Sequence, residues 1–181
     1  MRGKRRFCKR VIMAQTAVEL PAMKYRIKGL PKSAFAPYFA MNARELAQTG
    51  ALRVVADKDR GFPCRVSLRD ADKGESLLLL NYVSHPVDNP YRSAHAIFVR
   101  ELAEEPAPYV DCLPPVFAGR HLSLRGFAKG GLMVDALLAA PGSVEEGIDR
   151  LFANGEVACI HAHNAAYGCF AARIERHGAD Q

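Results

Sequence analysis

Two histidines near the C-terminal end are the residues whose spacing points most directly to chemistry. They stand two positions apart in the run Ile160-His161-Ala162-His163-Asn164. Successive side chains of a β-strand point to opposite faces, so a strand here places both imidazoles on one face, about 7 Å apart at the backbone. Such a pair can exchange protons with a substrate near neutral pH, or bind one metal ion together. We therefore predict His161 and His163 as catalytic residues, and as the metal ligands if the protein holds a metal.

Arginines and one further histidine could complete a pocket around this pair. Arg65 follows Pro63-Cys64, Arg92 stands in a proline-bounded run, and His95 begins the next expected strand. A guanidinium binds carboxylates and phosphates through paired hydrogen bonds. We predict that Arg65, Arg92, His95 and Asn164 bind a small anionic ligand, with Arg92 or His95 within reach of the two C-terminal histidines. For Arg65 the more common alternative is a side chain on a solvent-exposed strand face.

The cysteines offer a second, nucleophilic interpretation. Cys169 lies across the expected C-terminal turn from His163, where a neighbouring imidazolium could activate its thiol. Cys64 is a second candidate nucleophile. Free cysteines are usually buried, so simple packing is the alternative for both. The chain has five cysteines with no CxxC spacing, which indicates neither a thiol zinc cluster nor a disulfide framework.

Positive charge is concentrated at the start of the chain. The net charge is +6, and residues 1–22 hold six basic side chains against one acid, which leaves residues 23–181 at about +1. We interpret residues 1–22 as a basic extension, either disordered or an artefact of a start site upstream of Met13 or Met23. Any nucleic-acid binding is expected to be weak and to come from this extension. With no secretory signal and no membrane-length apolar run, the sequence predicts a cytoplasmic protein that spans no membrane.

Hydrophobic patterning predicts strands over most of residues 23–181. Residues 64–69 alternate apolar and polar side chains, and residues 77–80 are all leucine, typical of a half-buried and a fully buried strand. Two apolar runs flank Ala128-Lys129-Gly130-Gly131, which indicates a hairpin. Asn42 with Glu45, and Ser143 with Glu146, have the spacing of helix capping boxes. Together these features predict a single α+β domain, with a mostly antiparallel sheet of seven or eight strands and two or three helices.

Several blocks of the sequence resemble one family. They are Gly61-Phe62-Pro63-Cys64-Arg65-Val66-Ser67-Leu68-Arg69-Asp70-Ala71, Gly74-Glu75, Asn81-Tyr82, Pro90-Tyr91-Arg92-Ser93, His95-Ala96-Ile97-Phe98-Val99-Arg100-Glu101, Ile160-His161-Ala162-His163-Asn164 and Gly168-Cys169. In order and spacing they are similar to a bacterial family called domain of unknown function 1203, over about residues 23–176. The resemblance implies that the domain begins near Met23, and it implies no activity because the family has none assigned.

The leading hypothesis is a small protein whose polar pocket binds a small anionic molecule. Its predicted wall consists of Arg65, Arg92, His95, His161, His163 and Asn164. A histidine is the expected acid or base if the protein is an enzyme, because the ordinary pKa of histidine lies near cellular pH. Two alternatives stay open: a non-catalytic interaction or structural module, and a metal-binding protein that uses His161 and His163. Convergence of the named side chains in one concave pocket would favour the first hypothesis.

Overall fold

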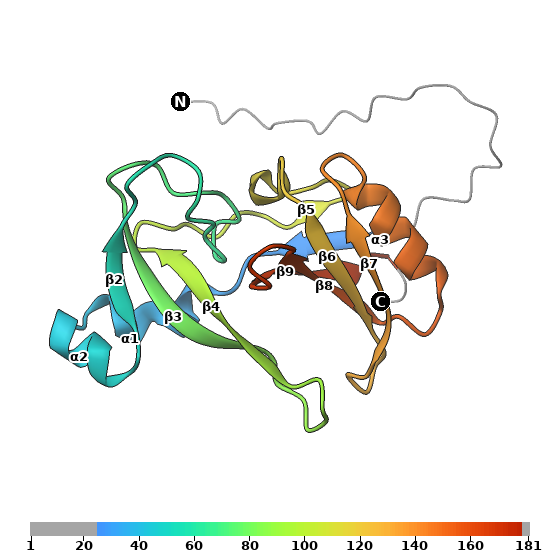
Figure 1. Cartoon of the computed structure of the whole chain (residues 1–181), viewed down its shortest axis with the longest axis horizontal. Helices are drawn as coiled ribbons and strands as arrows, with labels where there is room; N and C mark the ends of the chain where they lie inside the picture. The colour runs from blue at the N-terminus through green and yellow to red at the C-terminus, as the bar shows by residue number, and fades with distance from the viewer. Residues whose placement is uncertain (1–24, 179–181) are drawn as a thin grey trace.

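The computed structural model describes residues 25–178, which form two antiparallel sheets (Figure 1). Within these residues, the strand order is β5-β1-β9-β8-β6-β7 in the larger sheet and β2-β3-β4 in the smaller one. The strands are β1 (Tyr25–Lys28), β2 (Leu52–Val55), β3 (Ser76–His85), β4 (Ser93–Arg100), β5 (Tyr109–Val110), β6 (Leu122–Phe127), β7 (Met133–Ala139), β8 (Cys159–Asn164) and β9 (Phe170–Arg176). The helices are η1 (Lys32–Phe35), α1 (Ala36–Phe39), α2 (Ala43–Gln48), η2 (Pro115–Phe117) and α3 (Val144–Ala153).

The predicted α+β class is confirmed, and the predicted sheet is corrected. Residues 25–178 contain nine strands in two sheets rather than seven or eight in one. One strand that was not predicted is β5, which pairs with β1. It has two residues and lies in a proline-rich segment, where hydrophobic periodicity gives no signal. No helix in this part of the chain is long and apolar enough to cross a membrane. The extension predicted at residues 1–22 lies outside the described residues.

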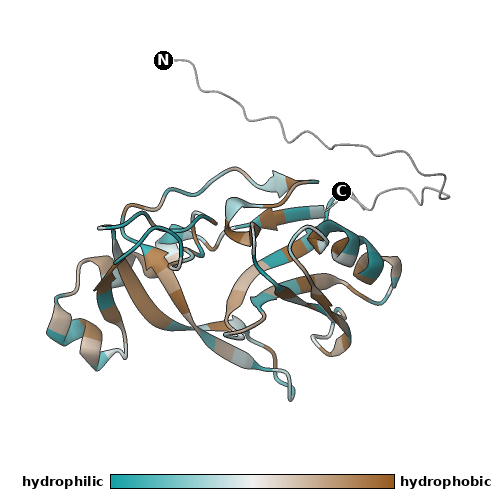
Figure 2. Ribbon diagram, turned by 45° about the horizontal axis from the view of Figure 1, so that its top comes forward, coloured by the Kyte–Doolittle hydropathy of each residue, from teal (hydrophilic) through white to brown (hydrophobic). Residues whose placement is uncertain are grey.

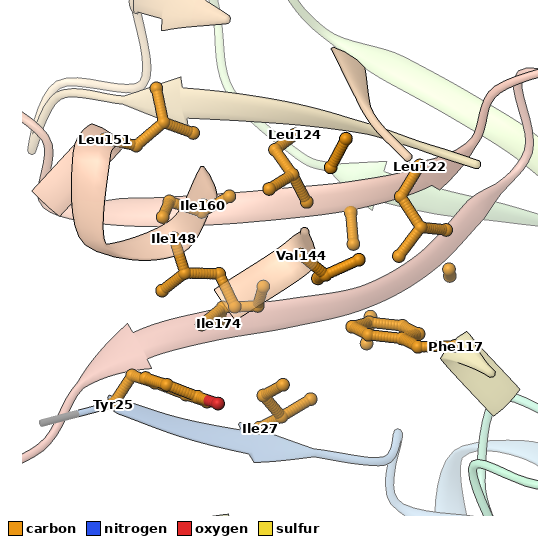
Figure 3. Packing of buried hydrophobic residues seen from close by; sticks show 14 of the residues in the cluster. Tyr25, Ile27, Phe117, Leu122, Leu124, Val144, Ile148, Leu151, Ile160 and Ile174 are labelled. Carbon is orange, nitrogen blue, oxygen red and sulfur yellow. The ribbon is translucent and has the colours of Figure 1, made fainter. Parts of the chain in front are cut away.

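The larger sheet buries one face against α3 (Figure 3). Ile148 and Leu151 of α3 pack against Leu124 of β6 and Ile160 of β8. These helix residues recur at the spacing of one helical face, so burial of that face stabilises α3. The predicted capping box at its start is wrong, because the Ser143 hydroxyl donates to the carbonyl of Ala140 instead of capping the helix.

The smaller sheet has a core of its own, supplied partly by the short helices. Leu78 of β3 and Ile97 of β4 are buried with Phe35 and with Leu46 of α2, and Figure 2 shows the long hydrophobic stretches of β3 and β4 in brown. The predicted capping box of α2 is confirmed. The Asn42 side chain accepts from the backbone amide of Glu45, and the Glu45 side chain accepts from the backbone amide of Asn42.

Residues 64–69, predicted as a strand, instead form a tight loop between the two sheets. The amide of Cys64 donates to the carbonyl of Arg69 (3.0 Å), and Leu68 turns the chain with a φ of 50°. Alternation fails as a guide here because the polar Arg65 and Ser67 are buried along with their apolar neighbours. Both find hydrogen-bond partners on other segments, so neither needs solvent.

The sheets also meet at their hairpin ends. The β3–β4 turn lies beside the β6–β7 turn (Figure 1). The ring Nε2 of His85 donates to the carbonyl of Gly131 (2.8 Å), and the Asn89 amide donates to the carbonyl of Gly130 (3.3 Å). The larger and smaller sheets are therefore held together both at the 64–69 loop and at these two turns.

Gly29 is predicted to be essential for the contact between β1 and the 64–69 loop. A Cβ at this position would lie 1.9 Å from the carbonyl oxygen of Val66, so the backbone must shift. The adjacent amide of Leu30 donates to the carbonyl of Arg65 (2.7 Å), and that bond would be strained too. We expect Gly29→Ala to lower the free energy of unfolding by about 3 kcal/mol in urea denaturation.

Gly155→Ala is the matched control for this substitution. Nothing lies within 4 Å of the added Cβ there, and the backbone is not left-handed. We expect this variant to be as stable as the parent or more stable by about 0.5 kcal/mol. Equal unfolding midpoints for the two variants would show that the close approach at Gly29 does not constrain the fold.

Candidate functional site

A cavity of about 720 Å³ lies between the loop that follows β2, one face of the smaller sheet and the β8–β9 turn. Its volume is in the range of sites that hold small molecules. Part of its wall is apolar, with the rings of Phe62 and Phe98 in edge contact at 5.3 Å between centroids. Its polar lining is Asp57, Lys58, Arg65, Arg120, His121, Asn164 and Cys169.

Arg65 is the most buried charged group in this lining, with 1% of its surface exposed. Its Nε donates to the carbonyl of Phe170 (2.6 Å), one Nη donates to the carbonyl of Pro63, and the other donates to the Sγ of Cys169 (3.2 Å). A guanidinium has five N–H groups, and three of them are used in these bonds. The other two have no hydrogen-bond partner among residues 25–178.

A second buried arginine shows how Arg65 differs. Arg100 is 3% exposed and forms an ion pair with Glu75, whose carboxylate raises the pKa of Arg100. Within residues 25–178, Arg65 forms no ion pair with a carboxylate, and burial lowers its pKa. Arginine nevertheless stays protonated at neutral pH. A buried cation with only neutral partners is stabilised by an anion placed beside it.

The other charged side chains of the cavity also favour an anion. Lys58 is exposed at its edge, and Arg120 is partly buried with its Nη2 2.7 Å from a carboxylate oxygen of Asp70. The lining therefore carries the positive charges of Lys58, Arg65 and Arg120 against the one negative charge of Asp57. With the carboxylate of Asp70 counted as well, these groups still carry a net positive charge, which attracts anions.

The β8–β9 turn presents a thiol to the same cavity. The Sγ of Cys169 accepts from Arg65 and also from the Asn164 amide (3.3 Å). Gly168 adopts a left-handed conformation before it, with a φ of +70°, which favours glycine. The Nδ1 of His163 donates to the carbonyl of Gly168 (3.0 Å). Hydrogen bonds to Gly168 and to Cys169 therefore both hold the turn in place.

His161 and His163 lie in a buried cluster of histidines next to this turn. They share one face of β8 as predicted, with ring centroids 6.3 Å apart. The predicted approach of His95 is confirmed as well, since its ring lies 4.8 Å from that of His163. His85 lies 5.1 Å from His161 on the other side. The same-face geometry from the HxH spacing is therefore correct.

Burial keeps the two histidines of β8 neutral. Both are 1% exposed, and desolvation lowers the pKa of His161 to about 3 and that of His163 to about 4, aided by positive charge on neighbours such as Arg125. His163 holds its proton on Nδ1, where it donates to Gly168. Among the described residues, the Nε2 of His163 and both ring nitrogens of His161 have no hydrogen-bond partner.

The predicted site residues thus fall into three places. Arg65 and Asn164 line the cavity. His95, His161 and His163 belong to the neighbouring cluster, and Arg92 is exposed in the β3–β4 turn. Within residues 25–178, no group of three or more histidine, cysteine, aspartate or glutamate side chains is arranged to hold a metal ion. The predicted metal ligands His161 and His163 therefore have no third ligand in this part of the chain.

Sequence reasoning missed several residues that line the cavity. Lys58, Arg120, His121 and Tyr167 come from three separate loops, and none stands in a motif. A local signal existed only for Tyr167, which stands between the candidate residues Asn164 and Cys169. Arg120 and His121 directly precede β6, and Tyr167 lies between Asn164 and Cys169 in the β8–β9 turn.

Comparison with known proteins identifies one family. The sequence model of a family described as "Protein of unknown function (DUF1203)" matches residues 61–176, more than half of the chain. The matched region contains Arg65, both histidines of β8 and Cys169. Neither the curated proteins nor the solved structures contain a match.

The buried histidines are predicted to make the stability of the protein depend on pH. Their pKa values in the folded state lie below the ordinary 6.5, so the unfolded chain binds more protons below that pH. Their contribution is complete above pH 6.5 and is lost as the pH falls toward 4 and 3. We expect each histidine to add a slope of up to about 1.4 kcal/mol per pH unit to the free energy of unfolding in this window.

His161→Phe tests this prediction, because a phenyl ring fits between Phe127 and Phe170 and cannot be protonated. We expect the variant to lose part of the slope measured by urea denaturation between pH 6.5 and 4.5. His121→Gln replaces an exposed histidine and serves as the control. Parallel pH profiles for the parent and His161→Phe would contradict the neutral, buried state of His161.

Proposed function

We propose that this chain, which belongs to the DUF1203 family of proteins of unknown function, binds a small organic anion in the cavity beside Arg65. The observation that carries the proposal is the guanidinium of Arg65, buried at the cavity wall without a carboxylate partner among residues 25–178. An anion in the cavity would supply the missing counter-charge, and the spare N–H groups of Arg65 would bind it.

The chemistry of the remaining wall favours a ligand with an apolar part. Phe62 and Phe98 form one aromatic surface, and Tyr167, which is largely exposed, stands at the edge of the cavity. Such side chains bind an aromatic or aliphatic group while the charged end faces Arg65. A carboxylate attached to a ring or a short alkyl chain satisfies both requirements, whereas inorganic phosphate would leave the apolar wall unused.

The sequence-predicted residues take different parts in this proposal. Asn164, with Arg65, contributes to the binding wall, and its amide also holds Cys169. His163 acts as a positioning residue, because its bond to the carbonyl of Gly168 fixes the turn that presents the thiol. The acid–base role of His161 and His163 stays a prediction. If the bound anion reacts, His121 is the cavity residue suited to exchange a proton with it.

Binding of an aromatic carboxylate tests the proposal. We expect benzoate and 4-phenylbutyrate to raise the melting temperature of the full chain at millimolar concentration, because a ligand bound only by the folded state stabilises it. Their neutral amides should raise it less, since they lack the charge that Arg65 attracts. Isothermal titration calorimetry then gives the affinity for each compound.

Substitution at the edge of the cavity sharpens the test while leaving Arg65 in place. We expect Lys58→Gln to weaken the binding of the carboxylates about two- to fivefold, and added salt to have a similar effect. Lys129→Gln, in the distant β6–β7 turn, is the matched control and should bind as the parent does. Equal and negligible effects of the acids and their amides would favour the interaction or structural module instead.

A further inference from the structure

We propose that Cys169 is a nucleophilic thiol that exchanges with small anionic disulfides in the cavity. The inference rests on the proposed function, because the positive charge that would bind an organic anion is also what would bring such a disulfide to the sulfur. It goes further by assigning a covalent reaction to the site and by naming the class of its substrate: a disulfide that carries carboxylates.

Two hydrogen-bond donors contact the sulfur of Cys169, and a deprotonated cysteine sulfur is the form that attacks a disulfide. The Nη2 of Arg65 lies 3.2 Å from the Sγ of Cys169, and the Nδ2 of Asn164 lies 3.3 Å from it. Both groups donate a hydrogen bond, and one carries a full positive charge. A negative sulfur would also be a counter-ion for Arg65, whose other described partners are neutral carbonyls.

Cys169 differs from the other described cysteines in both access and surroundings. It is partly exposed and lines the cavity. Cys64 is fully buried, and its Sγ accepts from the backbone amide of Arg100 (3.3 Å), which is a structural contact. Cys159 is also buried, and burial raises the pKa of its thiol. Cys112 is partly exposed but does not line the cavity.

The reaction balances without any further oxidant. The Cys169 thiol first releases its proton to solvent. The thiolate attacks one sulfur of the disulfide RSSR, a bond forms between that sulfur and the Sγ of Cys169, and the bond between the two R-bearing sulfurs breaks. Its electron pair leaves on the second sulfur as the thiolate RS⁻. The protein is left with a mixed disulfide at Cys169, and one R group is released in reduced form.

The cavity lining offers both charged and apolar contacts to this disulfide. Lys58 and Arg120 lie in the same lining and can pair with carboxylates of R, while Phe62 and Phe98 contact its apolar part. The leaving thiolate is also an anion, so the same positive potential stabilises it as the S–S bond breaks. An anionic disulfide should therefore react faster at Cys169 than the intrinsic reactivity of the thiol alone would predict.

The experiment compares an anionic with a neutral disulfide on the reduced full chain. The anionic probe is 5,5′-dithiobis(2-nitrobenzoate), the neutral one is 2,2′-dithiodipyridine, and release of the coloured thiol gives the rate. With Cys8, the one cysteine outside the described residues, replaced by serine in every chain tested, we expect a fast phase of one equivalent with the anionic probe, and peptide mass spectrometry should place the mixed disulfide on Cys169. The fast phase should be absent in Cys169→Ser and retained in Cys112→Ser.

Charge variants separate attraction of the anion from simple exposure of the thiol. We expect Lys58→Gln and Arg120→Gln each to slow the anionic probe about two- to fivefold and to leave the neutral probe within a factor of two. Lys129→Gln should change neither rate. Location of the adduct by mass spectrometry does not depend on the folding of the charge variants.

Two results would overturn the inference: labelling at Cys169 no faster than at Cys112, or equal effects of Lys58→Gln on the two probes. Either result leaves the proposed function standing if benzoate still raises the melting temperature. Loss of both the fast phase and the carboxylate binding would remove the proposed function as well.

Discussion

The arrangement of the two sheets depends on burying the charge of Arg65. Removing a guanidinium from water costs several kcal/mol unless its N–H groups find acceptors. The acceptors here are the carbonyls of Pro63 and Phe170 and the sulfur of Cys169, which come from segments more than a hundred residues apart. The backbone amide of Arg65 also donates to Phe98 in β4. One residue therefore ties the smaller sheet to β9, and the cavity lies beside this junction.

Features governed by neighbours in the sequence could be predicted. The HxH spacing placed both histidines on one face because strand side chains alternate whatever the rest of the fold does. The Asn42–Glu45 cap and the glycine turn before β7 are local in the same sense, since the partners lie within a few residues. The family resemblance is confirmed over residues 61–176, but it predicted nothing about how the side chains are arranged in space.

Features governed by distant partners could not be predicted from the sequence. Alternation in residues 64–69 indicated an exposed polar face, yet Arg65 is buried because its acceptors arrive with β9. Ser143 has the spacing of a cap but bonds backward to Ala140. The cavity combines Lys58, Arg120 and Cys169 from three connections, and no local pattern relates them. This part of the candidate site is thus a property of the tertiary structure alone.

The position of β1 has a consequence for the order in which the protein folds. The first described strand lies between β5 and β9, with Arg26 opposite both Val110 and Glu175. The β3–β4, β6–β7 and β8–β9 hairpins close short loops and can form early, whereas pairing β1 closes loops that span most of the described chain. Gly29 follows this strand directly and docks against the loop of Arg65. Docking of the Arg65 loop against both Leu30 and Phe170 therefore joins segments far apart in the sequence, and loop-closure entropy disfavours such contacts early in folding.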